Sequence, residues 1–574
     1  MISKIQSSEI KNKNSVTPLK TGGNVQHQNF KGVGDLILQG VQLCERNPMV
    51  NVSVLDFSTA IIPRTIIETY SGDTVVDENG KKKRKANAFA GMEAFRREAS
   101  GLVINCLIPG FIVAAIAKLI QRPIMKGFDK TNLSNIWANS DSLDKISKYY
   151  LEAKGANKED KVFDMCRNML RDLEGADGNV AKNGNVKFSS FADLDKNAKE
   201  MADCILDNNK SVKKAYQNLV AKTHIGEHIK FKGDADYFTS NLESLMTNTV
   251  KVVKEFNKEN IVDEKSVKDY ISKAKKLVNR KSLAGLAVII PLAVAAQPIN
   301  RWLTRKSSGM TGAPIYDEFK DGKNESGGVK LSAKDKADLF KQKIISVSSM
   351  VGVALLSMMK MPSMKMLEFS GIFPSMDMAR IVATSTFASR MAASEDKNEL
   401  QLSTVRDITT FASMYFLGDY AAKGVATAME KANPELKLLN RFKEAPKDAN
   451  VLQKFWNWVK NTSIKSTDEL PTVKAKNMRT WCQVANIGFS LALLGIIVPM
   501  LTVGSAQKGR KKDLEAQQKQ NSLADMNSGS KKESNENVTS NVTSNVTKEV
   551  VESEKVANID FHRVSFDRFN SKVG

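Results

Sequence analysis

The sequence predicts a mainly α-helical fold: a polytopic helical membrane protein with a helical soluble domain and disordered termini. Three observations support this fold class: long uncharged apolar blocks, charged stretches with helical spacing between them, and polar ends without hydrophobic periodicity. The chain has 574 residues, of which 42% are hydrophobic and 26% charged. This composition is typical of a folded protein rather than of a wholly disordered one.

The N-terminal part divides into two segments. Residues 1–35 are polar and weakly periodic, so we expect a disordered segment there, and it lacks the apolar core of a secretory signal. Residues 36–98 are expected to form a mixed, partly helical segment that includes a basic loop, residues 77–85. A solvated loop is the simplest interpretation of that loop, and contact with anionic lipid is the alternative.

Four apolar blocks are candidates for membrane insertion, because a helix needs about 20 apolar residues to cross a bilayer core of about 30 Å. Nineteen uncharged residues separate Glu98 from Lys118, nineteen separate Lys281 from Arg301, and twenty-eight separate Arg479 from Lys508. A fourth, shorter block is diluted by serine. We therefore predict transmembrane helices at residues 99–120, 282–300 and 481–507, and a possible transmembrane helix at residues 344–360. The alternative is a soluble all-α protein that buries these helices in its core.

Each of the three stronger blocks contains a proline that follows isoleucine or valine, namely Pro109, Pro291 and Pro499. Proline removes a backbone donor and kinks a helix. A set of kinked helices around a path is one interpretation. The other is that proline is simply common in transmembrane helices.

The segments between the blocks are charged and mostly helical in pattern. We expect a soluble α-helical domain at residues 127–280, a Gly/Ser/Lys-rich linker at residues 307–340, and a helical, partly membrane-associated region at residues 361–480. Within the last region, residues 408–418 are expected to form a packed or interfacial helix. Residues 508–574 are expected to be a disordered basic and polar tail.

Two tryptophans in the region 361–480 have two possible environments. Trp456 and Trp458 lie beside Lys454 and Lys460, which suits a membrane–water boundary. Packing of the two rings in an ordinary core is the alternative.

The charge balance points to a membrane surface. The 85 basic and 63 acidic residues give a net charge of +22, and the basic residues are concentrated beside the apolar blocks. We therefore expect the lipid bilayer as partner, through anionic head groups at the Lys/Arg flanks, with possible protein partners and no nucleic acid. Both flanks of each block are basic, so the membrane orientation is not predicted. The five scattered cysteines form no C-x-x-C pair, and with the missing secretory signal they favour a bacterial cytoplasmic membrane.

One short string suggests metal chemistry. His224-Ile-Gly-Glu227-His228 has the form H-x-x-E-H, which resembles the metal motif of the inverzincin peptidases. The resemblance implies that His224 and His228 would share a zinc ion on one helical face, with Glu227 placed to activate water. A second string, residues 179–190, has the turn glycine of a calcium loop, but serine stands where a bidentate glutamate is needed.

The sequence predicts an integral membrane protein of structural, scaffold or interaction type, without catalytic, cofactor-binding or metal-binding residues. Two rival functions remain open: a small-solute transporter or channel with the three prolines along its path, and a zinc metallopeptidase built on His224, Glu227 and His228. Against the transporter, no ionisable residue lies inside the three stronger blocks.

Overall fold

The structure is a computed structural model, and it describes most of the chain between residues 40 and 533. The described residues are 40, 44, 48–71, 74–76, 82–84, 86–132, 137–174, 191–234, 237–238, 240–310, 312–316, 331–358, 367–370, 373–442, 445–446 and 448–533. Several of the predicted features lie wholly or partly outside them: the N-terminal segment, most of the loop 77–85, the calcium-like string, residues 311 and 317–330 of the linker, and the chain after residue 533.

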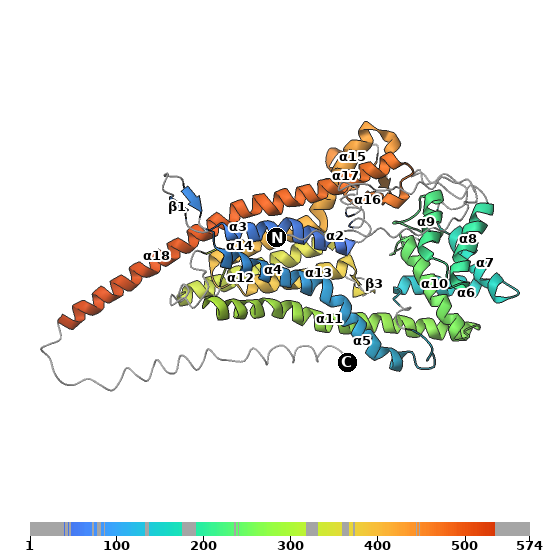
Figure 1. Cartoon of the computed structure of the whole chain (residues 1–574), viewed down its shortest axis with the longest axis horizontal. Coiled ribbons are helices and arrows are strands. Elements are labelled where there is room, and N and C mark those ends of the chain that lie inside the picture. Colours follow the sequence, from blue (N-terminus) through green and yellow to red (C-terminus); the bar gives the residue numbers. More distant parts are fainter. Residues whose placement is uncertain are drawn as a thin grey trace, which may run out of the picture. The chain divides into compact units, whose positions relative to one another are not determined.

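The fold is mainly helical, as predicted, and short two-stranded sheets connect some of the helices (Figure 1). The helices of the first unit, in chain order, are α2 (Pro48–Leu55), α3 (Ile62–Thr69), α4 (Ala88–Leu102), α5 (Ile108–Ile124), α6 (Ser140–Glu152), α7 (Lys158–Arg171), α8 (Phe191–Leu206), α9 (Val212–Thr223), α10 (Leu242–Lys258), α11 (Glu264–Ser308), α12 (Ala333–Met358), α13 (Met376–Ala392), α14 (Lys397–Ala412), α15 (Gly418–Ala432), α16 (Val451–Asn461) and α17 (Val473–Ser490). The last helix, α18 (Val498–Glu533), starts in this unit, which ends at Gln507, and continues into a second unit of residues 508–574.

The remaining elements are hairpins and short turns. The antiparallel pairs are β1 (Thr74–Val76) with β2 (Lys82–Arg84), β3 (Phe369–Ser370) with β4 (Phe373–Pro374), and β5 (Leu439–Arg441) with β6 (Thr462–Ile464). Two 3-10 turns are η6 (Pro434–Leu436) and η7 (Thr467–Glu469), and four π-helical turns are η1 (Asp56–Ile61), η2 (Val103–Leu107), η5 (Ser413–Leu417) and η8 (Leu491–Ile497).

Side-chain caps fix where several helices begin. Asn139 accepts a hydrogen bond from the Ser142 amide before α6, and Asp263 accepts one from the Ser266 amide before α11. Such caps satisfy backbone donors that have no partner inside the helix, and each stabilises its helix by about 1 kcal/mol. The long helix α11 therefore has a defined start in the polar part of the chain.

Five helical stretches are long and apolar enough to cross a membrane. They are Met49–Thr69, Ala88–Ile124, Glu264–Ser308, Ala333–Met358 and Val473–Leu523. The last four contain the four blocks that the sequence indicates. The first was missed, because Asp56, Arg64 and Glu68 interrupt its apolar run. These stretches pack with α13 and α14 into a bundle, whose central core includes Met350, Ala383 and Phe411.

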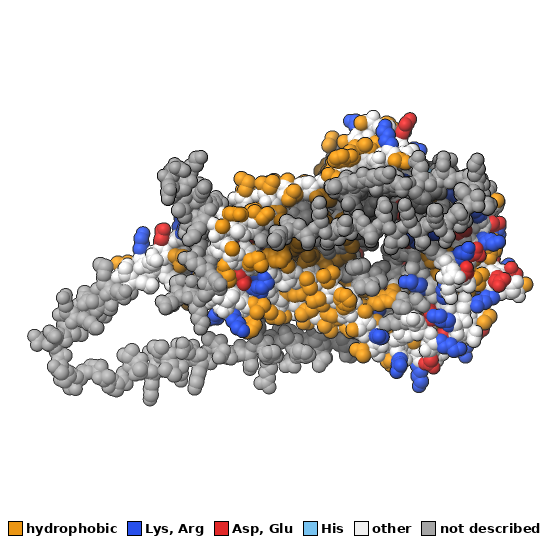
Figure 2. All heavy atoms as spheres, in the orientation of Figure 1, with side chains coloured by type: hydrophobic (Ala, Val, Ile, Leu, Met, Phe, Trp, Pro, Cys, Tyr) orange, Lys and Arg blue, Asp and Glu red, His pale blue; other side chains and the backbone are white. Residues whose placement is uncertain are grey.

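Helices α5 and α11 lie side by side and approach closely in this bundle. A Cβ atom added at Gly285 would lie only 2.6 Å from the Val113 side chain, so glycine is required where these backbones meet. The bundle exposes large apolar side chains on the outer faces of the candidate spans, among them Phe111 (73%), Leu119 (78%) and Met500 (77%). Figure 2 shows hydrophobic side chains gathered over α3, α4 and α13 on the face in view.

A separate core holds α6–α10 against the first half of α11. Its fully buried side chains include Tyr149, Phe231, Phe256 and Tyr270. Charged side chains cover the outside of this part in Figure 2. These helices fall within residues 127–280, where the sequence predicts a helical domain, but the predicted end at residue 280 lies in the middle of α11, a single helix of 45 residues that continues into the bundle.

The second half of the sequence departs from prediction in two places. Helix α12 begins at Ala333, inside the segment 307–340 that was predicted to be a linker. The region 361–480 is helical, as predicted, and the segment 408–418 packs inside, with Phe411 fully buried. The tail was predicted without structure from residue 508, whereas α18 stays helical to Glu533. The helix continues past the apolar block because the charged residues that follow it also have helical spacing. Polarity alone therefore did not predict where the helix ends.

Helix α16 carries the two tryptophans and buries none of its residues. Trp458 packs toward α15, where its indole N–H donates to the Thr427 hydroxyl at 3.0 Å. Trp456 is half exposed beside Phe455. Neither ring is buried, so neither tryptophan belongs to a buried core.

Candidate functional site

Among the π-helical turns in the described ranges, three precede a proline by two residues. Pro63 follows η1, Pro109 follows η2 and Pro499 follows η8, each directly after isoleucine or valine. Proline lacks a backbone donor and clashes with the carbonyl four residues earlier, and a wider turn accommodates that defect. The fourth turn, η5, ends at Gly418, and Pro291 instead lies inside the continuous helix α11.

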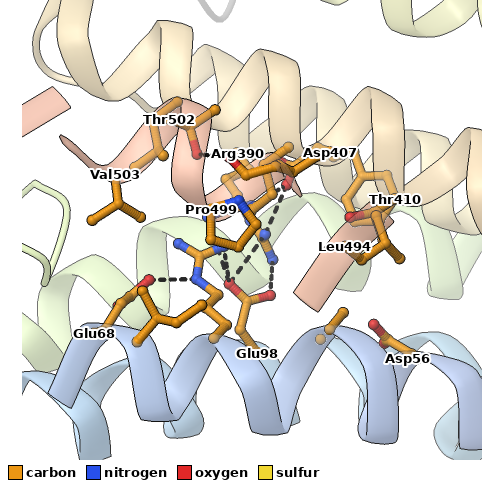
Figure 3. Close-up of a pocket in the computed structure, with 18 of the residues that line it drawn as sticks. Asp56, Glu68, Glu98, Arg390, Asp407, Thr410, Leu494, Pro499, Thr502 and Val503 are labelled. Atoms are coloured by element: carbon orange, nitrogen blue, oxygen red, sulfur yellow. Dashed lines mark hydrogen bonds and ion pairs between the residues drawn. The ribbon is translucent and has the colours of Figure 1, made fainter. Parts of the chain in front are cut away.

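The same three turns meet around one cavity in the bundle (Figure 3). Asp56 and Ala60 from η1, Asn105 from η2 and Leu494 from η8 line it, and Pro499 closes one side. The cavity measures about 60 Å³, which is room for a few water molecules or one small ion. Because π-helical turns in membrane and soluble proteins often mark functional sites, this cavity is the candidate site.

A network of buried ion pairs forms one wall of the cavity. Glu98 of α4 forms ion pairs with Arg64 of α3 at 3.1 Å and with Arg390 of α13 at 3.1 Å. Arg390 also contacts Asp407 of α14 at 3.1 Å, and Arg406 contacts the same carboxylate at 2.6 Å. One carboxylate therefore joins α3, α4 and α13, and Figure 3 shows Glu98 facing Arg390.

Not all oxygens in this wall are satisfied. Glu68 is paired with Arg64, and both Glu68 and Asp407 are 1% exposed. Yet Glu68 Oε2 and Asp407 Oδ2 are buried without a hydrogen-bond partner in the described structure. Buried acceptors without donors cost about 1–3 kcal/mol each, which points to a proton, water or cation that completes them.

Asp56 adds an unpaired acid to the cavity. It lies on the opposite side from Arg390, and it makes no ion pair with any residue that the structure describes. In total four carboxylates (Asp56, Glu68, Glu98 and Asp407) and three guanidinium groups (Arg64, Arg390 and Arg406) line the cavity. With all groups ionised the cavity carries an excess of one negative charge, which suits a cation rather than an anion.

A second buried ion cluster lies next to the first. Arg301 of α11 contacts Glu399 of α14, and Arg97 reaches the same carboxylate at 4.0 Å. Arg97 also donates to the backbone oxygen of Gly312 at 2.8 Å. These pairs hold α4, α11 and α14 together.

The sequence singled out one residue of this site, Pro499, but none of its charged residues. The signal was present in the stretch 49–69, where Asp56, Arg64 and Glu68 interrupt an otherwise apolar helix. Such residues within a candidate span are functional candidates by default. Arg390 and Asp407 could not be found in this way, because α13 and α14 are not among the apolar stretches and only the fold brings them to the cavity.

The H-x-x-E-H string adopts a different geometry from the one that its resemblance requires. Helix α9 ends at Thr223, and His224 is left-handed, with φ of 53°. The two histidines therefore do not share a helical face. The ring of His228 packs on Phe442 at 5.1 Å, and among the described residues no three His, Cys, Asp or Glu side chains group to hold a metal ion.

This loop instead joins two parts of the first unit. The Glu227 amide donates to Glu469 Oε1 of η7 at 2.7 Å, and the Ser466 amide donates to Glu469 Oε2 at 3.0 Å. Burial raises the pKa of the Glu469 carboxyl, although these backbone donors oppose the rise. The α6–α10 domain is thereby tied to the segment before α17.

Acid should weaken this tie through His224. Burial, and then the nearby Lys465, Lys476 and Lys437, lower the pKa of His224 below its usual 6.5. The folded state then binds fewer protons than the unfolded state, so its stability falls as pH drops below 6.5. We expect amide exchange in residues 212–231, followed by mass spectrometry and corrected for intrinsic rates, to accelerate between pH 7.5 and 5.5.

The variant His224→Asn tests this expectation, because asparagine tolerates the left-handed backbone but does not titrate. The acid-side acceleration should be smaller in this variant, and the remainder is expected from His228, whose pKa burial also lowers. The raised pKa of Glu469 acts in the opposite direction, since that carboxyl takes up its proton more readily in the folded state. Equal acceleration in both proteins would contradict a role for His224.

Comparison with protein-family models, with curated proteins and with solved structures finds no match for this chain.

Proposed function

We propose that the chain is a polytopic membrane protein that carries a proton or a small monovalent cation across the bilayer through the cavity at Asp56. The observation that supports it most is an unpaired acid, with two further carboxylate oxygens lacking donors, around a small cavity in a bundle of candidate membrane spans. Ionisable groups within such bundles usually mark ion or proton pathways.

The proposal requires membrane insertion, which is tested first. Five candidate spans and large exposed apolar side chains on their outer faces, such as Phe111 and Leu119, favour lipid as their surroundings. We expect membranes that contain the chain to retain it through washes with high salt and alkaline carbonate and to release it only in detergent. Release by carbonate would contradict the spanning arrangement.

The size of the cavity and its ligands limit the cargo. About 60 Å³ excludes sugars, amino acids and larger solutes. The carboxylates do not group as a metal centre in the described part of the chain, which disfavours a tightly bound divalent ion. A proton or a monovalent cation fits the remaining space and the excess negative charge.

The Asp56→Asn variant provides the functional test. In liposomes with an imposed membrane potential, the wild-type chain should dissipate a gradient of H⁺, Na⁺ or K⁺ faster than empty liposomes. Asp56→Asn should lower that rate at least tenfold, because an amide neither ionises nor releases a proton. Asp160→Asn, an exposed carboxylate of α7, is the matched control and should transport like the wild type.

A second candidate function is the scaffold or interaction role. It is favoured by the ion pairs that lock α3, α4, α13 and α14 together and by the tie between Glu227 and Glu469, both of which suit a rigid protein. Absence of flux above empty liposomes for every cation, in protein that inserts correctly, would remove the transport proposal and leave this candidate. Wild-type flux in Asp56→Asn would remove Asp56 from the path.

A further inference from the structure

A basic groove lies where the C-terminal end of α5 meets the first half of α11. It has a volume of about 730 Å³, within the range of pockets that hold drug-sized ligands. We propose that this groove binds an anionic phospholipid, with the phosphate on its basic rim and the acyl chains along its apolar wall. Its lining residues are Ile120, Pro123, Ile124, Lys126, Lys273, Lys276, Arg280, Leu283, Ala284 and Ala287.

The rim has a strong excess of positive charge. Lys126, Lys276 and Arg280 are exposed, and none of them makes an ion pair with a residue in the described ranges. No carboxylate is among the lining residues. Three unpaired cations facing one groove attract an anion, and a phosphate accepts hydrogen bonds from lysine and arginine together.

Lys273 holds the rim in place rather than supplying free charge. Its ammonium group donates to Asp269 at 2.7 Å and to the backbone oxygen of Lys126 at 2.9 Å, and it lies 4.9 Å from the Phe128 ring centroid. The chain can turn here because Gly127 has a φ of 94°, which other residues rarely adopt. The position of Lys126 is therefore set by the fold.

The apolar wall distinguishes a lipid from a free phosphate compound. Leu283 is 55% exposed and Leu119, next to the groove on α5, is 78% exposed, so the wall continues onto the outer face of the bundle. Inorganic phosphate or a soluble phosphate ester could use only the rim. A phospholipid covers both surfaces at once, and basic pockets between membrane helices are typical sites for anionic head groups.

The position of the groove along α11 agrees with this ligand. Arg280 and Arg301 stand 21 residues apart on one helix. At 1.5 Å per residue they are separated by about 31 Å, close to the thickness of a bilayer core. The rim would then lie at the head-group level of one leaflet, so this inference rests on the proposed membrane insertion.

The test measures lipid retained by the full chain purified in detergent. Native mass spectrometry compares phosphatidylglycerol and phosphatidylcholine with identical acyl chains, and glycerol 1-phosphate serves as the probe without chains. We expect the wild type to retain phosphatidylglycerol at least tenfold better than either of the other two. The triple variant Lys126→Gln/Lys276→Gln/Arg280→Gln should lose this preference.

A matched control removes three charges elsewhere. Lys199, Lys213 and Lys214 are exposed on α8 and α9, and their triple replacement by glutamine should leave lipid retention unchanged. Equal loss in both triple variants would show a general charge effect and overturn the site. Equal binding of glycerol 1-phosphate would overturn the lipid assignment. If the triple variant fails to fold, Arg280→Gln alone should still weaken retention while Arg280→Lys restores it, and unchanged retention in Arg280→Gln would overturn the site.

These outcomes are separate from those of the proposed function. A chain that carbonate releases from membranes fails both proposals. A chain that needs detergent, but whose triple variant keeps its lipid preference, fails only this one. A triple variant that loses the lipid preference but keeps its cation flux supports lipid binding in the groove, independently of the role of Asp56.

Discussion

Replacement of Arg390 by methionine is expected to lower the free energy of unfolding by about 3 kcal/mol, because it leaves buried carboxylates without their main partner. Arg390 contacts both Glu98 and Asp407 at 3.1 Å, and Asp407 is 1% exposed. The loss should stay near the lower end of the usual range, since Arg406 still contacts both acids and Arg64 still contacts Glu98. Thermal unfolding in detergent, followed by tryptophan fluorescence, measures it.

The double variant Arg390→Met/Asp407→Leu separates the two possible causes of the loss. If an uncompensated charge is responsible, removal of the acid as well should restore much of the stability. Lys213→Met, an exposed change of the same kind, should have little effect. A double variant that is less stable than Arg390→Met would show that packing of the arginine, rather than its charge, holds α13 in place.

Replacement of Phe256 by alanine should destabilise the α6–α10 domain by about 3–5 kcal/mol, the usual cost of deleting a buried aromatic ring. The ring is fully buried, and its centroid lies 4.9 Å from that of Tyr150 and 5.2 Å from that of Tyr270. Amide exchange should therefore accelerate across α6–α10.

The same variant tests whether the domain is separate from the bundle. Its core shares no member with the central core of the bundle, which includes Met350 and Phe411. We expect exchange in α12–α14 to stay at the wild-type rate, and Val262→Ala, an exposed change, to leave both parts unaffected. Acceleration throughout the bundle would mean that the two parts unfold as one cooperative unit.

The sequence predicted the helical class, four of the five candidate spans and the helical domain, because these depend on local composition and period. It missed the span at Met49–Thr69, where three charges lie within an apolar stretch. Those charges are tolerated because Arg64, Glu68 and Glu98 meet one another inside the bundle. A hydropathy average over a sequence window treats each of these charges as unfavourable for membrane insertion, because it cannot detect that they pair in the folded chain.

The candidate site depends on long-range contacts and was therefore out of reach. Asp56 and Asp407 come from segments about 350 residues apart in the sequence, and no local pattern relates them. The repeated pairs of isoleucine or valine with proline were a partial signal. They mark the π-helical turns at Pro109 and Pro499, and the same pair at Pro63 marks the third turn, which carries Asp56.

Because α11 is one continuous helix, it fixes how the side chains in its first half are rotated about the helix axis relative to those in its second half. Tyr270 packs in the core of α6–α10, and Arg301 contacts Glu399 in the bundle. The helical geometry of α11 sets the direction of both side chains. Each residue rotates the next side chain by about 100° around the helix axis. One alanine inserted after Lys281 would turn Arg301 a quarter-circle or more away from Glu399 while Tyr270 stays in place, whereas seven inserted residues would restore the direction and separate the domain from the bundle by about 10 Å.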